Sequence, residues 1–298
     1  MVPKVEFEVS KAVNEFCHLS VLYSDLMPAE LARGILGNRS YQERYNHLRQ
    51  AGLRLAIQKT RPFPSESEWH KFVTGFMNRD GSGGFRSLSS NSEFVKLFQN
   101  LRQRRATDFD EIWKEARPRL TEHMYDFMSL WLPISDKVLL RLQHLAKAHW
   151  QTGNIQVQYI DCLYGGFAWN EYIGLAACPD KNVQKKLLAH ELSELIAAQS
   201  MIREELRKAD LDPGIAHTIV DMLAYFSIRD FLAKPEPAGR ERKGLRPNPS
   251  YYPAAEILFP VFEHYAEDPW IYPDFASFIE DMIKSLQPQS VSLTSTNG

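Results

Sequence analysis

Apolar side chains recur along most of this chain every three or four residues, which is the spacing of an amphipathic helix. In residues 5–9 and 154–160, apolar and polar side chains alternate instead, and a short apolar run covers 172–177; these segments predict strands. The helical spacing predicts helices over 10–26, 28–60, 93–104, 109–131, 136–150, 187–196, 213–232 and 275–286. The pattern therefore predicts a mostly helical α+β protein with a small sheet.

Composition and charge are those of an ordinary globular protein. Of the 298 residues 44% are hydrophobic and 24% are charged, and the formal net charge is −2, so we expect neither nucleic acid nor a membrane as a partner. Three widely spaced cysteines, Cys17, Cys162 and Cys178, favour reduced thiols and a cytoplasmic protein over a disulfide framework. We expect no signal peptide and no membrane-spanning helix, because no apolar run is long enough.

The predicted helix over residues 187–196 carries the sequence His-Glu-x-x-Glu. Residues four apart lie on one helix face, so His190 and Glu194 can point at the same ion. Glu191 lies one position round the helix, where its carboxylate can reach a water bound to that ion. An amphipathic helix with a charged face would show the same pattern, so the neighbouring segments must distinguish the two interpretations.

The next predicted helix repeats this arrangement of side chains. It begins near Pro213, a residue that suits the first helical position, and places His217 and Asp221 four residues apart in an otherwise apolar segment. A buried aspartate needs a partner, because an unpaired carboxylate in apolar surroundings is costly. Two helices thus each supply a histidine and a carboxylate at helical spacing, which favours a metal site over a charged surface.

These motifs resemble the thermolysin-like peptidases, the zincins whose third zinc ligand is a glutamate. That family carries His-Glu-x-x-His and then Glu-x-x-x-Asp on the next helix. In this chain Glu194 stands where the family has a histidine, and His217 stands where it has a glutamate. The two exchanges leave a ligand set of two histidines and one carboxylate, with a fourth position for water.

The resemblance implies roles for the side chains of both motifs. With the two exchanges, which the family pattern does not contain, we infer a Zn²⁺ ion held by His190, Glu194 and His217. The resemblance implies Glu191 as the catalytic general base. It also implies that Asp221 accepts a hydrogen bond from His190 and so orients the ring. If His217 pointed away from His190, Asp221 would be the third ligand instead.

The segment before the first metal helix also resembles the family. In zincins a twisted sheet precedes that helix, and its edge strand pairs with an extended peptide substrate. The run Phe167-Ala168-Trp169-Asn170 is similar to the small-aromatic-Asn stretch of that edge strand, which implies Trp169 and Asn170 as substrate-binding residues. A tryptophan beside the Gly165-Gly166 pair also fits simple packing on the sheet.

We expect three regions along the chain. Residues 1–150 would be mainly helical with a short first strand. Residues 151–286 would form the zincin-like catalytic region, with a small twisted sheet, two metal-bearing helices and a helical C-terminal cap. A proline-rich surface loop is predicted over 234–253, and a disordered tail over the Ser/Thr-rich residues 287–298.

The sequence predicts a zinc-dependent peptidase or peptidase-like hydrolase that acts on a peptide or protein substrate. Glu191 would take a proton from metal-activated water and return it to the leaving amine. The alternative is a zincin-derived binding or regulatory module without catalysis, because a carboxylate in place of a histidine reduces the power of the metal to acidify water. Iron or manganese would fit the same ligand types.

Overall fold

The computed structural model describes residues 1–22, 92–163, 165–199, 202, 204, 208, 213–232 and 255–286. The described strands are β1 (Lys4–Glu8), β2 (Asn154–Ile160), β3 (Gly166–Trp169) and β4 (Tyr172–Ala176). The described α-helices are α1 (Lys11–Leu22), α5 (Ser92–Ala146), α6 (Lys181–Gln199), α8 (Pro213–Ile228), α9 (Ala255–Glu267) and α10 (Phe275–Leu286). The expected mostly helical α+β class is confirmed. The predicted helix over 28–60, the loop over 234–253 and the tail over 287–298 lie outside the described residues.

The described strands form one mixed sheet in the order β1-β2-β4-β3. The first strand pairs in parallel with β2, and β2 pairs in parallel with β4. Strand β3 runs antiparallel to β4 and lies at the end of this order. Asn170 and Glu171 join β3 to β4, and Asn170 has a φ of 54°, a left-handed conformation that asparagine adopts more readily than most residues.

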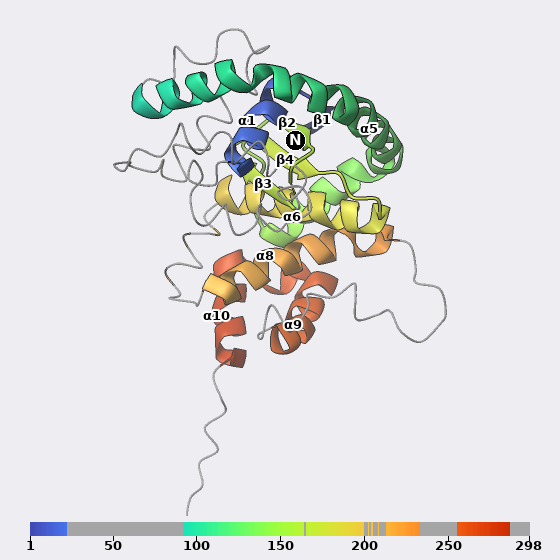
Figure 1. Ribbon diagram of the computed structural model, residues 1–298. Coiled ribbons are helices and arrows are strands. Elements are labelled where there is room, and N and C mark those ends of the chain that lie inside the picture. Colours follow the sequence, from blue (N-terminus) through green and yellow to red (C-terminus); the bar gives the residue numbers. More distant parts are fainter. Residues whose placement is uncertain are drawn as a thin grey trace, which may run out of the picture.

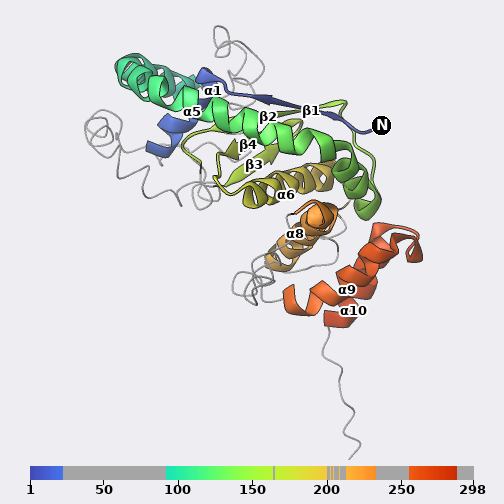
Figure 2. The ribbon, with the colours of Figure 1, turned by 90° about the vertical axis from the view of Figure 1, so that its right-hand side faces the viewer.

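The helices form layers on the sheet. Helix α6 lies along one side of the sheet, α8 lies beyond α6, and α9 and α10 lie beyond α8 (Figures 1 and 2). The long helix α5 follows a curved path and packs against β1, β2, α6 and α8 (Figure 1). Both metal-motif helices therefore belong to the interior layers rather than to the outer ones.

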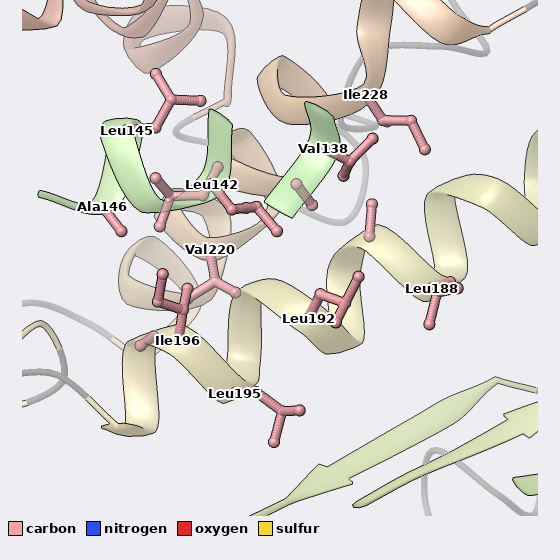
Figure 3. Packing of buried hydrophobic residues seen from close by; sticks show 14 of the residues in the cluster. Val138, Leu142, Leu145, Ala146, Leu188, Leu192, Leu195, Ile196, Val220 and Ile228 are labelled. Carbon is pink, nitrogen blue, oxygen red and sulfur yellow. The ribbon is translucent and has the colours of Figure 1, made fainter. Parts of the chain in front are cut away.

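Buried aliphatic side chains fix α6 between its neighbours. Figure 3 shows Leu192 and Ile196 on the side of α6 that faces α5 and α8. Leu142 of α5 and Val220 of α8 lie across from them, and Leu195 projects to the opposite side. All five belong to one hydrophobic cluster, and each buried leucine or isoleucine contributes on the order of 1.5–3 kcal/mol. This packing holds α6 and α8 in the register that the metal motif requires.

Helix α5 differs from the sequence prediction. The pattern predicts three helices between residues 93 and 150, whereas the structure shows the single helix α5 with Pro118 and Pro133 inside it. A proline removes one helical hydrogen bond and crowds the preceding turn, which usually ends or bends a helix. Here the fully buried Phe127 and Trp131 anchor the stretch between the two prolines to the core. Tertiary packing therefore overrides the local signal, and the prediction of three helices was wrong.

The described residues give two further facts that bear on the sequence predictions. No described helix has both the length and the hydropathy that crossing a bilayer requires. All three cysteines carry free thiols, with Cys17 and Cys162 buried and Cys178 partly buried. Burial raises the pKa of the Cys17 thiol well above its usual range, so this sulfur is not a nucleophile.

Candidate metal centre

Helices α6 and α8 place their motif residues opposite one another. Among the described elements, the most extensive packing joins these two helices. His190 lies on α6 and His217 lies on α8, 27 positions later in the chain, yet their ring centroids are 5.0 Å apart with the rings edge to face. The side chain of His217 thus points toward His190, as the zinc interpretation requires.

Three side chains converge on one point at this helix interface. His190, Glu194 and His217 each offer a ligand atom, and these atoms all lie within 4.8 Å of one another. Nδ1 of His217 is 3.5 Å from Oε1 of Glu194. Two ligands of a tetrahedral zinc with bonds of about 2.0–2.1 Å are separated by about 3.3–3.4 Å, so this pair is already close to the required spacing. The three residues therefore fit a divalent metal ion, whose identity the ligand types leave open.

Asp221 lies beside the three-residue group and contacts the ring of His190. Its Oδ1 is 2.7 Å from Nδ1 of His190, a hydrogen bond in which the ring nitrogen donates. A ring that donates through Nδ1 presents Nε2 as its ligand atom. The Asp221 side chain is 18% exposed, so it is mostly withdrawn from solvent as a partner of His190 should be.

The three-residue group is partly exposed to solvent. The side chains of His190 and Glu194 are 22% and 18% exposed, whereas that of His217 is 41% exposed. Structural zinc sites are usually closed by four protein ligands, while catalytic sites combine three protein ligands with an open position. Among the described residues, three side chains converge and each of them is partly exposed, so this part of the chain leaves the group open to solvent.

The carboxylate of Glu191 occupies a different environment from the ligands. The residue is 4% exposed, and its side chain lies directly against the backbone of Gly166 in β3. A Cβ atom at position 166 would come within 2.6 Å of Oε1 of Glu191, so any larger residue there would have to shift the Glu191 side chain. Burial, reinforced by the nearby Glu194 and Asp221 carboxylates, raises the pKa of Glu191 to about 7. A carboxyl group with this pKa can act as a general base near neutral pH.

The surroundings of His190 favour positive charge. Burial opposes a charge on the ring, but the hydrogen bond to Asp221 and the carboxylates of Glu191 and Glu194 outweigh it and raise the pKa of His190 to about 9. Three carboxylates next to two imidazoles create a negative local field, which a bound cation would neutralise. Since a metal binds only the deprotonated ring, its binding here would release a proton.

The two residues expected to bind substrate lie at the end of the β3–β4 hairpin. Trp169 is partly buried and pairs with Tyr172 across the two strands. Asn170 is exposed, and its carbonyl oxygen accepts a hydrogen bond of 3.0 Å from Nε2 of Gln199. The left-handed turn accounts for an asparagine at this position. Contact of Trp169 and Asn170 with a substrate stays a prediction.

Gly166 is a functional candidate that sequence reasoning did not single out. Gly166 begins β3, and its backbone lies against the side chain of Glu191. Its neighbour Gly165 has nothing within 4 Å of an added Cβ, so the close approach to Glu191 concerns Gly166 and not Gly165. The sequence signal for this position is a glycine followed directly by Phe167. That signal does not indicate which helix the glycine contacts.

No protein-family model matches this chain, and no match is found among curated proteins or solved structures. A functional assignment therefore depends on the chemistry of the site.

Proposed function

We propose that this protein is a zinc-dependent peptidase or peptidase-like hydrolase of the zincin type. The observation that carries the proposal is the open group of His190, Glu194 and His217 with the buried carboxylate of Glu191 adjoining it. The arrangement of a mixed sheet with an antiparallel edge strand next to the first metal helix supports it further. Each of these features corresponds to a part of the zincin pattern that the two motifs resemble.

Hydrolysis at this site would divide the chemistry between metal and protein. Bound zinc would lower the pKa of water to about 7 and polarise the carbonyl under attack. Glu191 accepts the proton that the attacking water loses and delivers it to the leaving amine. Asp221 keeps His190 in the tautomer that ligates through Nε2.

An extended peptide is the substrate that the sheet favours. Strand β3 pairs with β4 on one side, and among the described residues no strand lies on its other side. A peptide in extended conformation adds to such an edge through main-chain hydrogen bonds. Because β3 also packs against α6 next to Glu191, a peptide on this edge would pass close to the metal-motif helix.

A catalytically inactive binding or regulatory module is the second candidate, and the burial of Glu191 favours it. At 4% exposure this carboxylate lies under the backbone of β3, where water reaches it poorly. An inactive module would hold the metal through the same three ligands. It would differ from a hydrolase in turnover and not in metal content.

Metal content and turnover test the proposal together. Purified wild-type protein is expected to carry about one zinc per chain and to cleave members of a peptide library, with cleavage lost to a chelator and restored by zinc. Glu191→Gln should keep the zinc and lower the rate by about a hundredfold or more, because the general base is removed. Glu122→Gln, at an exposed position of α5, is the matched control and should retain the wild-type rate.

The outcomes separate the two candidates. Zinc at full occupancy with equal, negligible turnover in wild type and Glu191→Gln would support the inactive module. Absence of bound zinc, iron and manganese from the wild-type protein would contradict both.

A further inference from the structure

The carboxylate of Asp221 lies between the two histidine rings and offers a different oxygen to each. Oδ1 is 2.7 Å from Nδ1 of His190, and Oδ2 is 4.0 Å from Nε2 of His217. A carboxylate has acceptor capacity on both oxygens, so one aspartate can serve two ring N–H donors. The nitrogen that faces it differs between the rings: Nδ1 in His190 and Nε2 in His217.

The opposite side of the His217 ring faces the other carboxylate. Its Nδ1 is 3.5 Å from Oε1 of Glu194, close to the separation of about 3.3–3.4 Å between two ligands of one tetrahedral zinc. The two nitrogens of an imidazole point away from each other, so a ring cannot direct both at one ion. With Nε2 toward Asp221, the nitrogen that His217 can direct at an ion shared with Glu194 is Nδ1.

We infer that Asp221 orients both histidine ligands and that they bind the metal through opposite ring nitrogens: His190 through Nε2 and His217 through Nδ1. The inference rests on the metal site proposed above. It assigns a second task to Asp221, whose Oδ2 lies 4.0 Å from Nε2 of His217: a rotation of the carboxylate or of the ring that shortens this distance to hydrogen-bond length completes the contact in the metal-bound protein. On this inference Asp221 is not a ligand, because both of its oxygens would accept ring protons in the metal-bound protein.

This geometry explains how a histidine can replace a carboxylate on α8. His217 stands one helical turn before Asp221 on α8. From there its side chain must reach an ion that lies near Glu194. Ligation through Nδ1, the nitrogen nearer the backbone, needs less reach than ligation through Nε2. The shorter reach lets the ring lie between Glu194 and Asp221 without displacing either carboxylate.

Long-range ¹H–¹⁵N correlation spectra of the zinc-loaded, full-length protein labelled with ¹⁵N-histidine test the inference. The expected result is one metal-bound histidine with a protonated Nδ1 and one with a protonated Nε2, assigned through single variants of His190 and His217. Asp221→Asn offers one acceptor oxygen instead of two, so the ring signals of both histidines should move. Asp136→Asn, at an exposed position of α5, should leave them unchanged.

Zinc affinity gives an independent measurement without any assay of turnover. The amide of asparagine extends about as far as Nδ1 of histidine, and the amide of glutamine about as far as Nε2. His217→Asn should therefore bind zinc at least about tenfold more tightly than His217→Gln. At position 190 the order should reverse, so His190→Gln should bind zinc more tightly than His190→Asn. Competition with a chromogenic chelator measures all four affinities.

The results distinguish this inference from the proposed function. If wild-type protein binds zinc but both rings are protonated at Nδ1, or glutamine is the better replacement at both positions, the inference is wrong and the metal site stands. If wild-type protein binds no zinc, both are wrong.

Discussion

Asp221 and Glu191 are carboxylates beside the same histidine, and their surroundings give them different chemistry. Asp221 accepts a hydrogen bond from the His190 ring and so holds that ring in one orientation. Glu191 is buried against Gly166, which raises its pKa to about 7 and suits it to proton transfer. Residue identity alone does not separate these roles, because both side chains carry the same functional group.

Asp221→Asn should weaken zinc binding by about 10- to 100-fold, because the acceptor that holds the His190 tautomer is replaced by an amide. Zinc retained during dialysis against a chelator, compared with wild type, measures the loss. Asp136→Asn is the control, since that aspartate lies at an exposed position of α5. Equal retention in wild type and Asp221→Asn would show that the 2.7 Å contact with His190 does not support the site.

At the scale of elements, the centre depends on a helix pair and a strand. Helix α6 supplies His190, Glu191 and Glu194, and α8 supplies His217 and Asp221. Strand β3 supplies no ligand, but its backbone at Gly166 limits where the Glu191 carboxylate can lie. The carboxylate proposed as the general base is therefore positioned by an element that contributes no side chain to the metal group.

Gly166→Ala should displace the carboxylate of Glu191, because the new Cβ would lie 2.6 Å from Oε1. A displacement of about 1 Å at a catalytic group can cost on the order of a hundredfold in rate, so kcat for the hydrolysis should fall by about 10- to 100-fold with zinc content unchanged. Gly165→Ala is the matched control, since nothing lies within 4 Å of its added Cβ. Equal kcat values in the two variants would show that Gly166 does not position Glu191.

At the scale of the whole molecule, one core joins parts of the chain that are distant in sequence. Val5 of β1, Trp131 of α5, Leu192 of α6 and Phe278 of α10 all belong to the same hydrophobic cluster. The three candidate metal ligands lie on the two helices at the centre of these layers (Figure 2). A metal ion would thus link α6 to α8 inside the fold and not at its periphery.

Zinc should therefore raise the melting temperature of the protein. A ligand at 100 times its Kd stabilises the native state by about 2.7 kcal/mol, which corresponds to an increase in Tm of about 5–10 °C. Thermal unfolding followed with zinc and with a chelator measures the shift. His190→Ala/His217→Ala should abolish it, whereas His264→Ala, at an exposed position of α9, should keep it. A full shift in the double variant would place the stabilising zinc elsewhere.

Properties that depend on local spacing could be predicted from the sequence alone. His190 and Glu194, like His217 and Asp221, are four apart, and a helix puts such pairs on one face whatever surrounds it. The α+β class and strands near residues 5 and 154 also followed from local periodicity. These properties need only the geometry of one element, so the sequence predicts them.

Contacts between elements that neither motif anticipated came only from the tertiary structure. Only packing shows that β1 pairs with β2, that α5 continues through Pro133, and that Gly166 covers Glu191. The same holds for the nitrogen that each histidine turns toward Asp221, since the ring orientation depends on the distance and register between α6 and α8. Such contacts depend on how the elements pack in three dimensions, and no periodicity along the chain encodes them.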